Sequence, residues 1–303
     1  MPLCTTHLRK ISDQPIFQHQ YLLKPILALE VQLILYKYMS LGAAIKVIEN
    51  FSIGFTCLED LNDPFECTSF GFEEIDTSPI TASIATHACK NRFSRKYGVL
   101  SLTRQPLNAL MWSHYGDSHR GVVIGFDSEL AGFSDPEKNI IPSHYGEVIY
   151  SATKPHKDLP IINEDELMSI GTELKFEPST FNLAKRAFLY KSIEWAYEEE
   201  VRIVKNIAHL PFSYHFNEGR YKEWSKITVF GRPLYCLDIP KKSIKEIHIG
   251  NNIYKNVTRG NSISDTELIT LLKNWGKKDI KLFQCKIDTH SWNLIATPSI
   301  HQA

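Results

Sequence analysis

The stretch Met111–Asp127, MWSHYGDSHRGVVIGFD, joins a dense polar cluster to an apolar segment typical of a buried strand. Polar groups at the turn before a strand are held rigidly, so they can form a site. The stretch Tyr197–Val204, YEEEVRIV, likewise joins an acidic cluster to an apolar strand. We expect these two stretches to meet across one cleft, either within one sheet or facing each other.

The composition is that of an ordinary globular protein, since 43% of the 303 residues are hydrophobic and 22% are charged. Lys+Arg and Asp+Glu both number 34, so no overall basic field holds nucleic acid, although a local basic patch stays open. The six cysteines are scattered without C-x-x-C spacing, which favours reduced thiols. The apolar run Leu22–Leu35 is too short to span a bilayer. We therefore expect a cytoplasmic protein without membrane contact.

Apolar spacing and turn residues predict a mixture of helices and strands. Strands are expected at the end of Tyr21–Tyr38 and at 52–58, 99–103, 121–127, 147–152, 199–205, 235–239, 244–249 and 280–287. Helices are expected after the N-cap Ser40, at 79–97, at 106–115, at 164–191 and after the capping box at Ser264. Strands and helices do not alternate regularly, which predicts an α+β fold with mixed or antiparallel sheets and flanking helices. Residues 1–20 are expected to form an arm, and 21–303 a single domain with one cleft.

The segment Asn62-Asp63-Pro64-Phe65 carries strong turn chemistry. We expect a rigid loop beside the cleft, with Phe65 anchored in the core and Asp63 capping backbone amides. A plain surface turn is the alternative.

Glu198, Glu200 and Arg202 should share one face of a strand, because strand side chains alternate. Two neighbouring carboxylates can raise one pKa, and the arginine can hold the other carboxylate ionised. The alternative is an exposed strand face with a salt bridge.

Trp112 and Tyr115 should share a helix face, either as core anchors or as a flat surface for a ring of a ligand. His114, Asp117 and His119 are residue types that bind metals, but Gly116 breaks the helical i, i+4 spacing of a zinc site. No P-loop, G-x-S-x-G or G-x-G-x-x-G motif supports a kinase, a serine hydrolase or a Rossmann dehydrogenase.

Five blocks resemble the bacterial domain-of-unknown-function family 2971. They are LYKYMSL (35–41), LNDPFEC (61–67), LSLTRQPLNALMWSHYGDSHRGVVIGFD (100–127), WAYEEEVRIV (195–204) and IKEIHIGNNI (244–253). They occur in the family's order and cover about Leu33 to Ile287. The resemblance implies a cytoplasmic bacterial protein and supplies no activity.

The chain also resembles the ADP-ribosyltransferase superfamily in the order of three features. These are a first strand that carries tyrosines, an aromatic central stretch and a late strand of the form E-x-E-V. This resemblance implies that a residue near Tyr36 or Tyr38 grips the ribose of NAD. It also implies that Tyr115 or Trp112 stacks on nicotinamide, and that Glu200 with Glu198 bonds the ribose 2′-hydroxyl. The first strand of that superfamily usually carries a His or an Arg, and LYKY has neither. Lys37 is expected to point away from both tyrosines.

The sequence and this resemblance together predict an NAD-dependent ADP-ribosyltransferase-like enzyme. It would be a toxin or phage-defence effector that modifies a protein or a nucleic acid. The expected catalytic residues are Glu200, Glu198, Arg202 and His114. The expected cofactor-binding residues are Tyr36, Tyr38, Trp112, Tyr115, His119, Asn62 and Asp63, with no bound metal. The alternatives are a non-catalytic module that binds a nucleotide or a peptide, and a metal-dependent nuclease that uses His114, Asp117, His119 and the glutamates.

Overall fold

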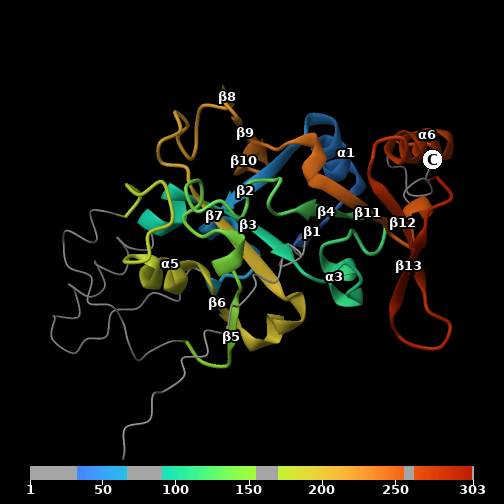
Figure 1. The fold of residues 1–303 in the computed structure, drawn as a ribbon, viewed down its shortest axis with the longest axis horizontal. Helices are drawn as coiled ribbons and strands as arrows, with labels where there is room; N and C mark the ends of the chain where they lie inside the picture. Colours follow the sequence, from blue (N-terminus) through green and yellow to red (C-terminus); the bar gives the residue numbers. More distant parts are fainter. Residues whose placement is uncertain (1–32, 67–90, 155–169, 256–262, 302–303) are drawn as a thin grey trace, which may run out of the picture. The chain divides into compact units, whose positions relative to one another are not determined.

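The computed structural model describes residues 33–66, 91–154, 170–255 and 263–301 (Figure 1). The chain divides into two units, Met1–Val31 and Gln32–Ala303, and all of the described residues belong to the second unit. The expected arm 1–20 and the helical part of Tyr21–Tyr38 lie outside the described residues. Within the described ranges, none of the helices has both the length and the apolar character needed to cross a membrane.

One large mixed sheet dominates the described residues, with the order β13–β12–β11–β4–β1–β3–β2–β10–β9–β8 and with β7 paired to β3 off this path. Only β11 and β12 pair in parallel within it. Its strands are β1 (Ile34–Met39), β2 (Ser52–Cys57), β3 (Tyr97–Thr103), β4 (Val122–Asp127), β7 (Glu200–Asn206), β8 (Gly219–Tyr221), β9 (Trp224–Val229), β10 (Arg232–Asp238), β11 (Ile244–Ile249), β12 (Lys281–Ile287) and β13 (Leu294–Pro298). The α+β prediction is confirmed, and so is the prediction that Tyr197–Val204 enters the same sheet as Gly121–Asp127.

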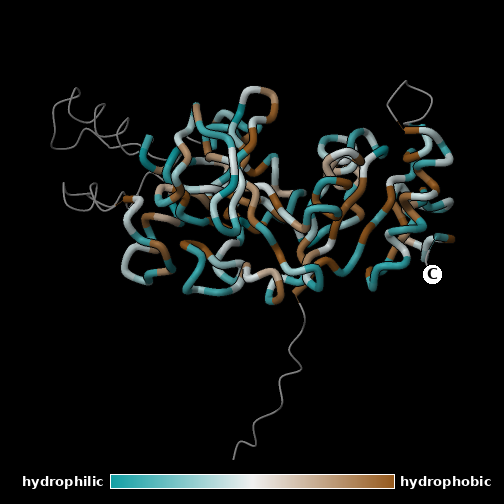
Figure 2. Tube along the Cα trace, turned by 90° about the horizontal axis from the view of Figure 1, so that it is seen from above, coloured by the Kyte–Doolittle hydropathy of each residue, from teal (hydrophilic) through white to brown (hydrophobic). Residues whose placement is uncertain are grey.

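The sheet buries apolar residues on both faces, in agreement with the hydrophobic character of its central strands (Figure 2). One face packs against α1 (Leu41–Asn50) and α6 (Asp265–Gly276), which share a core with alternate residues of β4 and β7. The opposite face packs against α3 (Ala109–His114) and α5 (Phe181–Phe188), which contribute to two smaller cores. The strand alternation therefore assigns each residue of β3 and β7 to one of two layers.

The sheet forks at β3. One edge of β3 pairs with β7 along its whole length, from Tyr97↔Asn206 to Thr103↔Glu200. The other edge is shared, because β1 pairs only at Thr103 and β2 pairs only at Val99 and Gly98. The middle of β3, around Ser101, therefore has no strand partner on this edge, and a gap opens between β1 and β2.

Local capping chemistry accounts for several helix limits. Ser40 caps α1 by accepting a hydrogen bond from the amide of Ala43, and Ser264 and Glu267 form the expected capping box of α6. The helix predicted to open at Pro106 begins instead at Ala109. The reason is Asn108, whose side chain accepts hydrogen bonds from the amides of Leu110 and Met111.

Two other sequence predictions are wrong in detail. The helix expected at 79–97 ends before Tyr97, which begins β3, and its part before residue 91 lies outside the described residues. Gly98 lies inside β3, where an added Cβ would come within 2.9 Å of the Cβ of Phe55. The helix expected at 164–191 ends early, because α5 ends at Phe188 and the chain enters β6 (Tyr190–Ser192). Strand β6 pairs in parallel with β5 (Ile149–Ser151) in a separate small sheet. Strands β8, β9 and β13 are not predicted from the sequence.

Candidate functional site

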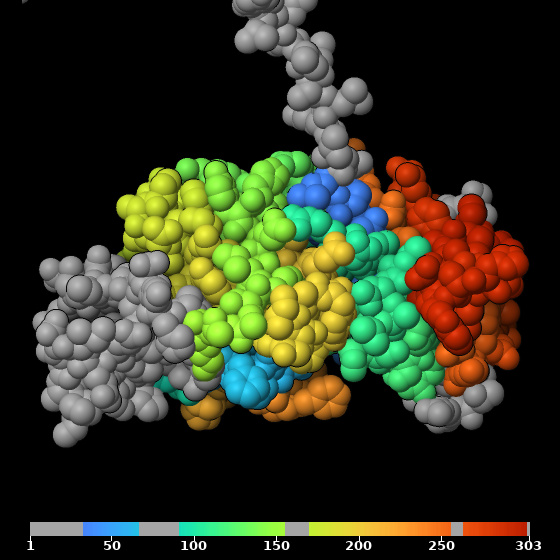
Figure 3. All heavy atoms as spheres, turned by 90° about the horizontal axis from the view of Figure 1, so that it is seen from below, coloured from blue at the N-terminus to red at the C-terminus, as the bar shows by residue number. Residues whose placement is uncertain are grey.

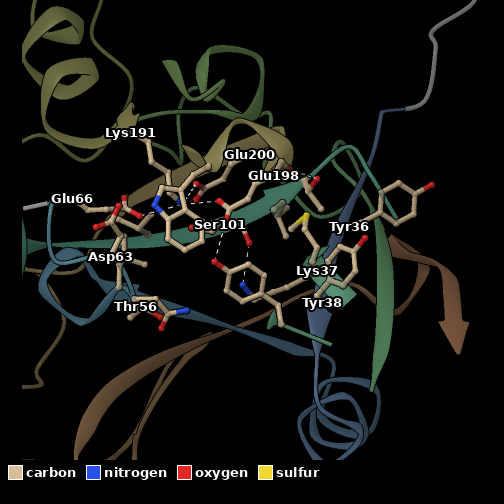
Figure 4. A pocket seen from close by; sticks show the side chains of 18 of the residues that line it. Tyr36, Lys37, Tyr38, Thr56, Asp63, Glu66, Ser101, Lys191, Glu198 and Glu200 are labelled. Atoms are coloured by element: carbon tan, nitrogen blue, oxygen red, sulfur yellow. Dashed lines mark hydrogen bonds and ion pairs between the residues drawn. The ribbon is translucent and has the colours of Figure 1, made fainter. Parts of the chain in front are cut away.

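A pocket of about 230 Å³ lies at the fork of the sheet (Figure 4). Five regions of the chain meet there: β1, the end of β2 with the segment after it, β3, the region of α3, and the segment from β6 to the start of β7. Figure 3 shows the loop after β2 (light blue), the 3-10 helix η4 (Ile193–Glu198, yellow) and the region of α3 (green) side by side on one face. The lining residues are Tyr36, Lys37, Tyr38, Thr56, Asp60, Leu61, Asn62, Asp63, Glu66, Val99, Ser101, Leu102, Thr103, Met111, Tyr115, Lys191, Trp195, Glu198 and Glu200.

Lys191 is the centre of a buried ion cluster on one wall of this pocket. Its Nζ lies 2.6 Å from Glu198 Oε2, 3.1 Å from Glu200 Oε2 and 3.3 Å from Glu66 Oε1. It also lies 5.1 Å from the ring centre of Trp195, within the range of a cation–π contact. Burial opposes the charged form of Lys191, but the surrounding carboxylates outweigh it and raise its pKa. This lysine is therefore fixed as a cation by its three carboxylate partners.

Arg202 lies behind this wall and is 1% exposed. Its Nε donates to Glu200 Oε1 at 2.8 Å and its Nη1 to the carbonyl of Phe188 at 2.7 Å, while Nη2 pairs with Glu66. Glu198 and Glu200 are 3% and 4% exposed, so the alternative of an exposed, salt-bridged strand face is wrong. The alternation prediction holds from Glu200 onward, but Glu198 is the last residue of η4, two residues before β7 begins.

Two of the glutamates that line the pocket, Glu198 and Glu200, have pKa values shifted in opposite directions. Glu200 is buried, which opposes ionisation, but Arg202 and Lys191 outweigh this effect and lower its pKa. Burial raises the pKa of Glu198, and Lys191 only partly offsets it. The hydroxyl of Tyr115 donates to Glu198 Oε1 at 2.7 Å. Glu200 is therefore a fixed anion, whereas Glu198 is the carboxyl group suited to exchange a proton.

Tyr36 and Tyr38 line the pocket with their rings, while protein groups occupy both hydroxyls. The Tyr36 hydroxyl donates to Glu246 Oε2 at 3.0 Å, and in Figure 4 it points away from the carboxylates. The Tyr38 hydroxyl donates to the carbonyl of Gln105 at 2.6 Å and accepts from the amide of Asn108. Lys37 leaves β1 on the face opposite both tyrosines, as expected, because its partner Ile124 belongs to the main core and the partner of Tyr38, Val123, belongs to the core around α3. All three residues nonetheless line the pocket.

The loop Asn62–Phe65 lies beside the pocket, as predicted, with Asn62 and Asp63 in its wall. Asp63 Oδ1 accepts a hydrogen bond from the amide of Phe65 at 2.9 Å, which confirms the capping role. Phe65 is 66% exposed, so the prediction that it anchors in the core is wrong. Its place in the wall of a second cavity, of about 220 Å³, explains its outward position.

Three expected site residues from the central motif, Trp112, His114 and His119, do not line the pocket. Trp112 is fully buried, donates from Nε1 to the carbonyl of Pro106 at 3.0 Å and packs edge-to-face on Tyr38, so it is a core anchor. His119 stacks on Trp112 with ring centres 6.1 Å apart. His114, at the end of α3, is exposed. These positions do not agree with the expected roles. Trp112 and His119 were expected to contact the cofactor, and His114 was expected to be catalytic.

The segment Asp117–His119 forms a left-handed turn, with φ of 50°, 54° and 65° at three successive residues other than glycine. Arg120 holds it, since its Nη2 lies 2.7 Å from Asp117 Oδ1. The amide of Asn252 donates to the carbonyl of His119 at 2.9 Å. In the described part of the chain, no three His, Cys, Asp or Glu side chains group as metal ligands.

The sequence patterns missed several residues of the pocket: Lys37, Thr56, Asp60, Glu66, Ser101, Lys191 and Trp195. Four of them, Lys37, Glu66, Ser101 and Trp195, lie within the blocks that resemble the family, which was the available signal. Lys191 carried no signal, because its three carboxylate partners come together only in the folded chain.

The fold and this pocket define an α+β protein with one buried, ionised polar site. A family model described as "Protein of unknown function (DUF2971)" matches residues 111–203. This segment contains Tyr115, Lys191, Glu198 and Glu200, whereas β1 and β2 lie outside it. The match supports the resemblance to that family over this segment. Comparisons with curated proteins and with solved structures found no match.

Proposed function

We propose that the pocket binds the nicotinamide–ribose end of NAD and cleaves its glycosidic bond, transferring ADP-ribose to an acceptor. The observation that carries the proposal is the placement of two carboxylates, Glu198 and Glu200, in a pocket also lined by Tyr115 and Trp195. Its volume of about 230 Å³ lies just below the ~300–1,000 Å³ of ordinary small-molecule sites. One end of a dinucleotide would fill it.

The two carboxylates suit different parts of this reaction. Cleavage of the glycosidic bond passes through an oxocarbenium-like state, which a nearby fixed anion stabilises. Glu200 has this property, because Arg202 and Lys191 hold it ionised and in place. Glu198, whose pKa burial raises, would bond the ribose hydroxyl or accept the proton of the acceptor.

The test is a nicotinamide-release assay on the wild type and on Glu198→Gln and Glu200→Gln, with thermal melting of each protein with and without NAD. Each variant keeps the size of the side chain and removes one negative charge. We expect NAD to raise the melting temperature of all three proteins, and each variant to lose about a hundredfold or more in turnover. A folded wild type that neither binds NAD nor releases nicotinamide would contradict the proposal.

A specific observation also supports a non-catalytic binding module. Lys191 and Arg202 already neutralise much of the charge of Glu66, Glu198 and Glu200 through buried ion pairs. Such a network can shape a rigid pocket without reacting. Under this second candidate, NAD or another nucleotide raises the melting temperature and no nicotinamide appears.

A further inference from the structure

We propose that Lys37 is a carbonyl-reactive amine, which forms a Schiff base with a small aldehyde or ketone that enters the pocket. This inference goes beyond the proposed function and does not depend on NAD. It rests on where the fork of the sheet places the amine, and on how few protein groups engage it.

The fork brings Lys37 into the pocket. Ser101 has no strand partner on the β1 side of β3, because β1 pairs with β3 only at Tyr36↔Thr103. The side chain of Lys37 crosses this gap, and its Nζ donates to the carbonyl of Ser101 at 3.0 Å. In Figure 4 it reaches from β1 toward Ser101, below the carboxylates of Glu198 and Glu200. The amine thus lies on a central strand, at the wall of a cavity.

Two other lysines have ammonium groups whose hydrogen-bonding or charge partners are all supplied by the protein. Lys226 is 1% exposed, and its Nζ donates to the carbonyls of Ser213, Tyr214 and Phe216, so all three protons are used. Lys191 has three carboxylate partners. For Lys37, the contacts within the described residues comprise one carbonyl acceptor and no ion pair. Its remaining bonding positions are therefore available to a ligand.

The chemistry of the pocket fits this reaction. Burial lowers the pKa of Lys37, although the charge of Glu200 acts in the opposite direction, so the neutral amine is more accessible than in an exposed lysine. The lone pair of the amine forms the C–N bond, and a proton of the amine moves to the carbonyl oxygen. The Glu198 carboxyl then protonates this hydroxyl, which leaves as water, and the products are a protonated imine and the Glu198 carboxylate.

The test uses glycolaldehyde with cyanoborohydride, which converts an imine into a stable secondary amine, followed by peptide mass spectrometry. The wild-type chain supplies its own references, namely Lys226 as a buried amine without free protons and Lys242 as an exposed one. We expect Lys37 to be modified faster than Lys242 at neutral pH, since a lowered pKa leaves more of the amine in its neutral, reactive form. Lys226 should react more slowly than both.

The pH profile of the modification and two variants, Glu198→Gln and Lys37→Arg, test the same assignment independently. The modification rate of Lys37 should level off at a lower pH than that of Lys242, and Glu198→Gln should slow Lys37 alone if that variant keeps its cooperative melt. Lys37→Arg, which keeps the charge, should lose the modified peptide and retain the other sites. A Lys37 that reacts no faster than Lys242, with the same pH profile, would overturn the proposal whether or not nicotinamide release is observed.

Discussion

Two polar clusters precede strands of the same sheet, and they use their side chains in opposite ways. In the turn Asp117–Arg120, the polar groups bind the backbone and each other, and they hold three left-handed residues against the segment after β11. In the segment Glu198–Arg202, only Glu199 has a positive φ, and the side chains pair with buried cations at a pocket. The number of reactive residue types in a motif therefore does not locate a site. Burial of charge beside a cavity is the better sign.

The largest expected effect comes from removing the buried cation of the second cluster. Arg202→Leu leaves Glu66 and Glu200 with one fewer partner in a buried setting, so the free energy of unfolding should fall by about 3–5 kcal/mol. Urea denaturation measures it. The matched control is Arg104→Leu, whose ion pair with Glu147 is exposed and should contribute about 0.2–1 kcal/mol. Equal losses in the two variants would remove the distinction between the clusters.

The next effect tests the first cluster through its backbone. A Cβ on Gly250 would lie 2.2 Å from the carbonyl oxygen of His119, so Gly250→Ala must displace the left-handed turn. We expect a loss of about 1–3 kcal/mol in the free energy of unfolding, with the pocket itself unchanged. Gly42→Ala in α1 is the control, since nothing lies within 4 Å of its added Cβ, and it should stabilise by about 0.5–1 kcal/mol.

The third effect separates the two glutamates by pH. The pKa of Glu200 is lowered to about 2, so its stabilising effect grows as pH rises from about 2 to the ordinary 4.5 and is lost as pH falls through that range. The pKa of Glu198 is raised, so the folded state favours its proton, and stability falls as pH rises above 4.5.

Urea titrations at a series of pH values measure both trends. Each carboxyl group should change the free energy of unfolding by about 1.4 kcal/mol per unit of difference between its folded and unfolded pKa. Glu200→Gln should lose most relative to the wild type at pH above 4.5. Glu198→Gln should gain relative to the wild type over that same upward range. Parallel curves for the two variants would mean that both carboxylates have the same charge state.

The smallest expected effect belongs to His114, which the sequence placed among the catalytic residues. His114→Ala should change the free energy of unfolding by less than about 0.5 kcal/mol, because the side chain is exposed and does not line the pocket. Nicotinamide release, or NAD-induced stabilisation, should equal that of the wild type. A selective loss of either would return His114 to the site and weaken the contrast between the two clusters.

Periodicity and capping patterns predicted the α+β class, most central strands and the meeting of the two motif stretches in one sheet. Those features depend on local alternation and on caps such as Ser40 and Ser264. The pocket could be predicted only in part. Tyr36, Tyr115, Glu198 and Glu200 belong to recognisable motifs, whereas Lys37 enters the pocket through a gap in strand pairing. The pairing of Lys191 with Glu66 depends on tertiary packing, which no local pattern encodes.

The fork at β3 also has a consequence for folding kinetics. The pocket wall needs β1, the loop after β2, β3 and the start of β7, so contacts separated by more than a hundred residues must form before it exists. Such non-local pairing is slow, and it completes late. A molecule that binds there should therefore leave the refolding rate unchanged and slow unfolding in proportion to its occupancy. Stopped-flow unfolding in the presence of a bound nucleotide would reveal this protection as a longer native lifetime.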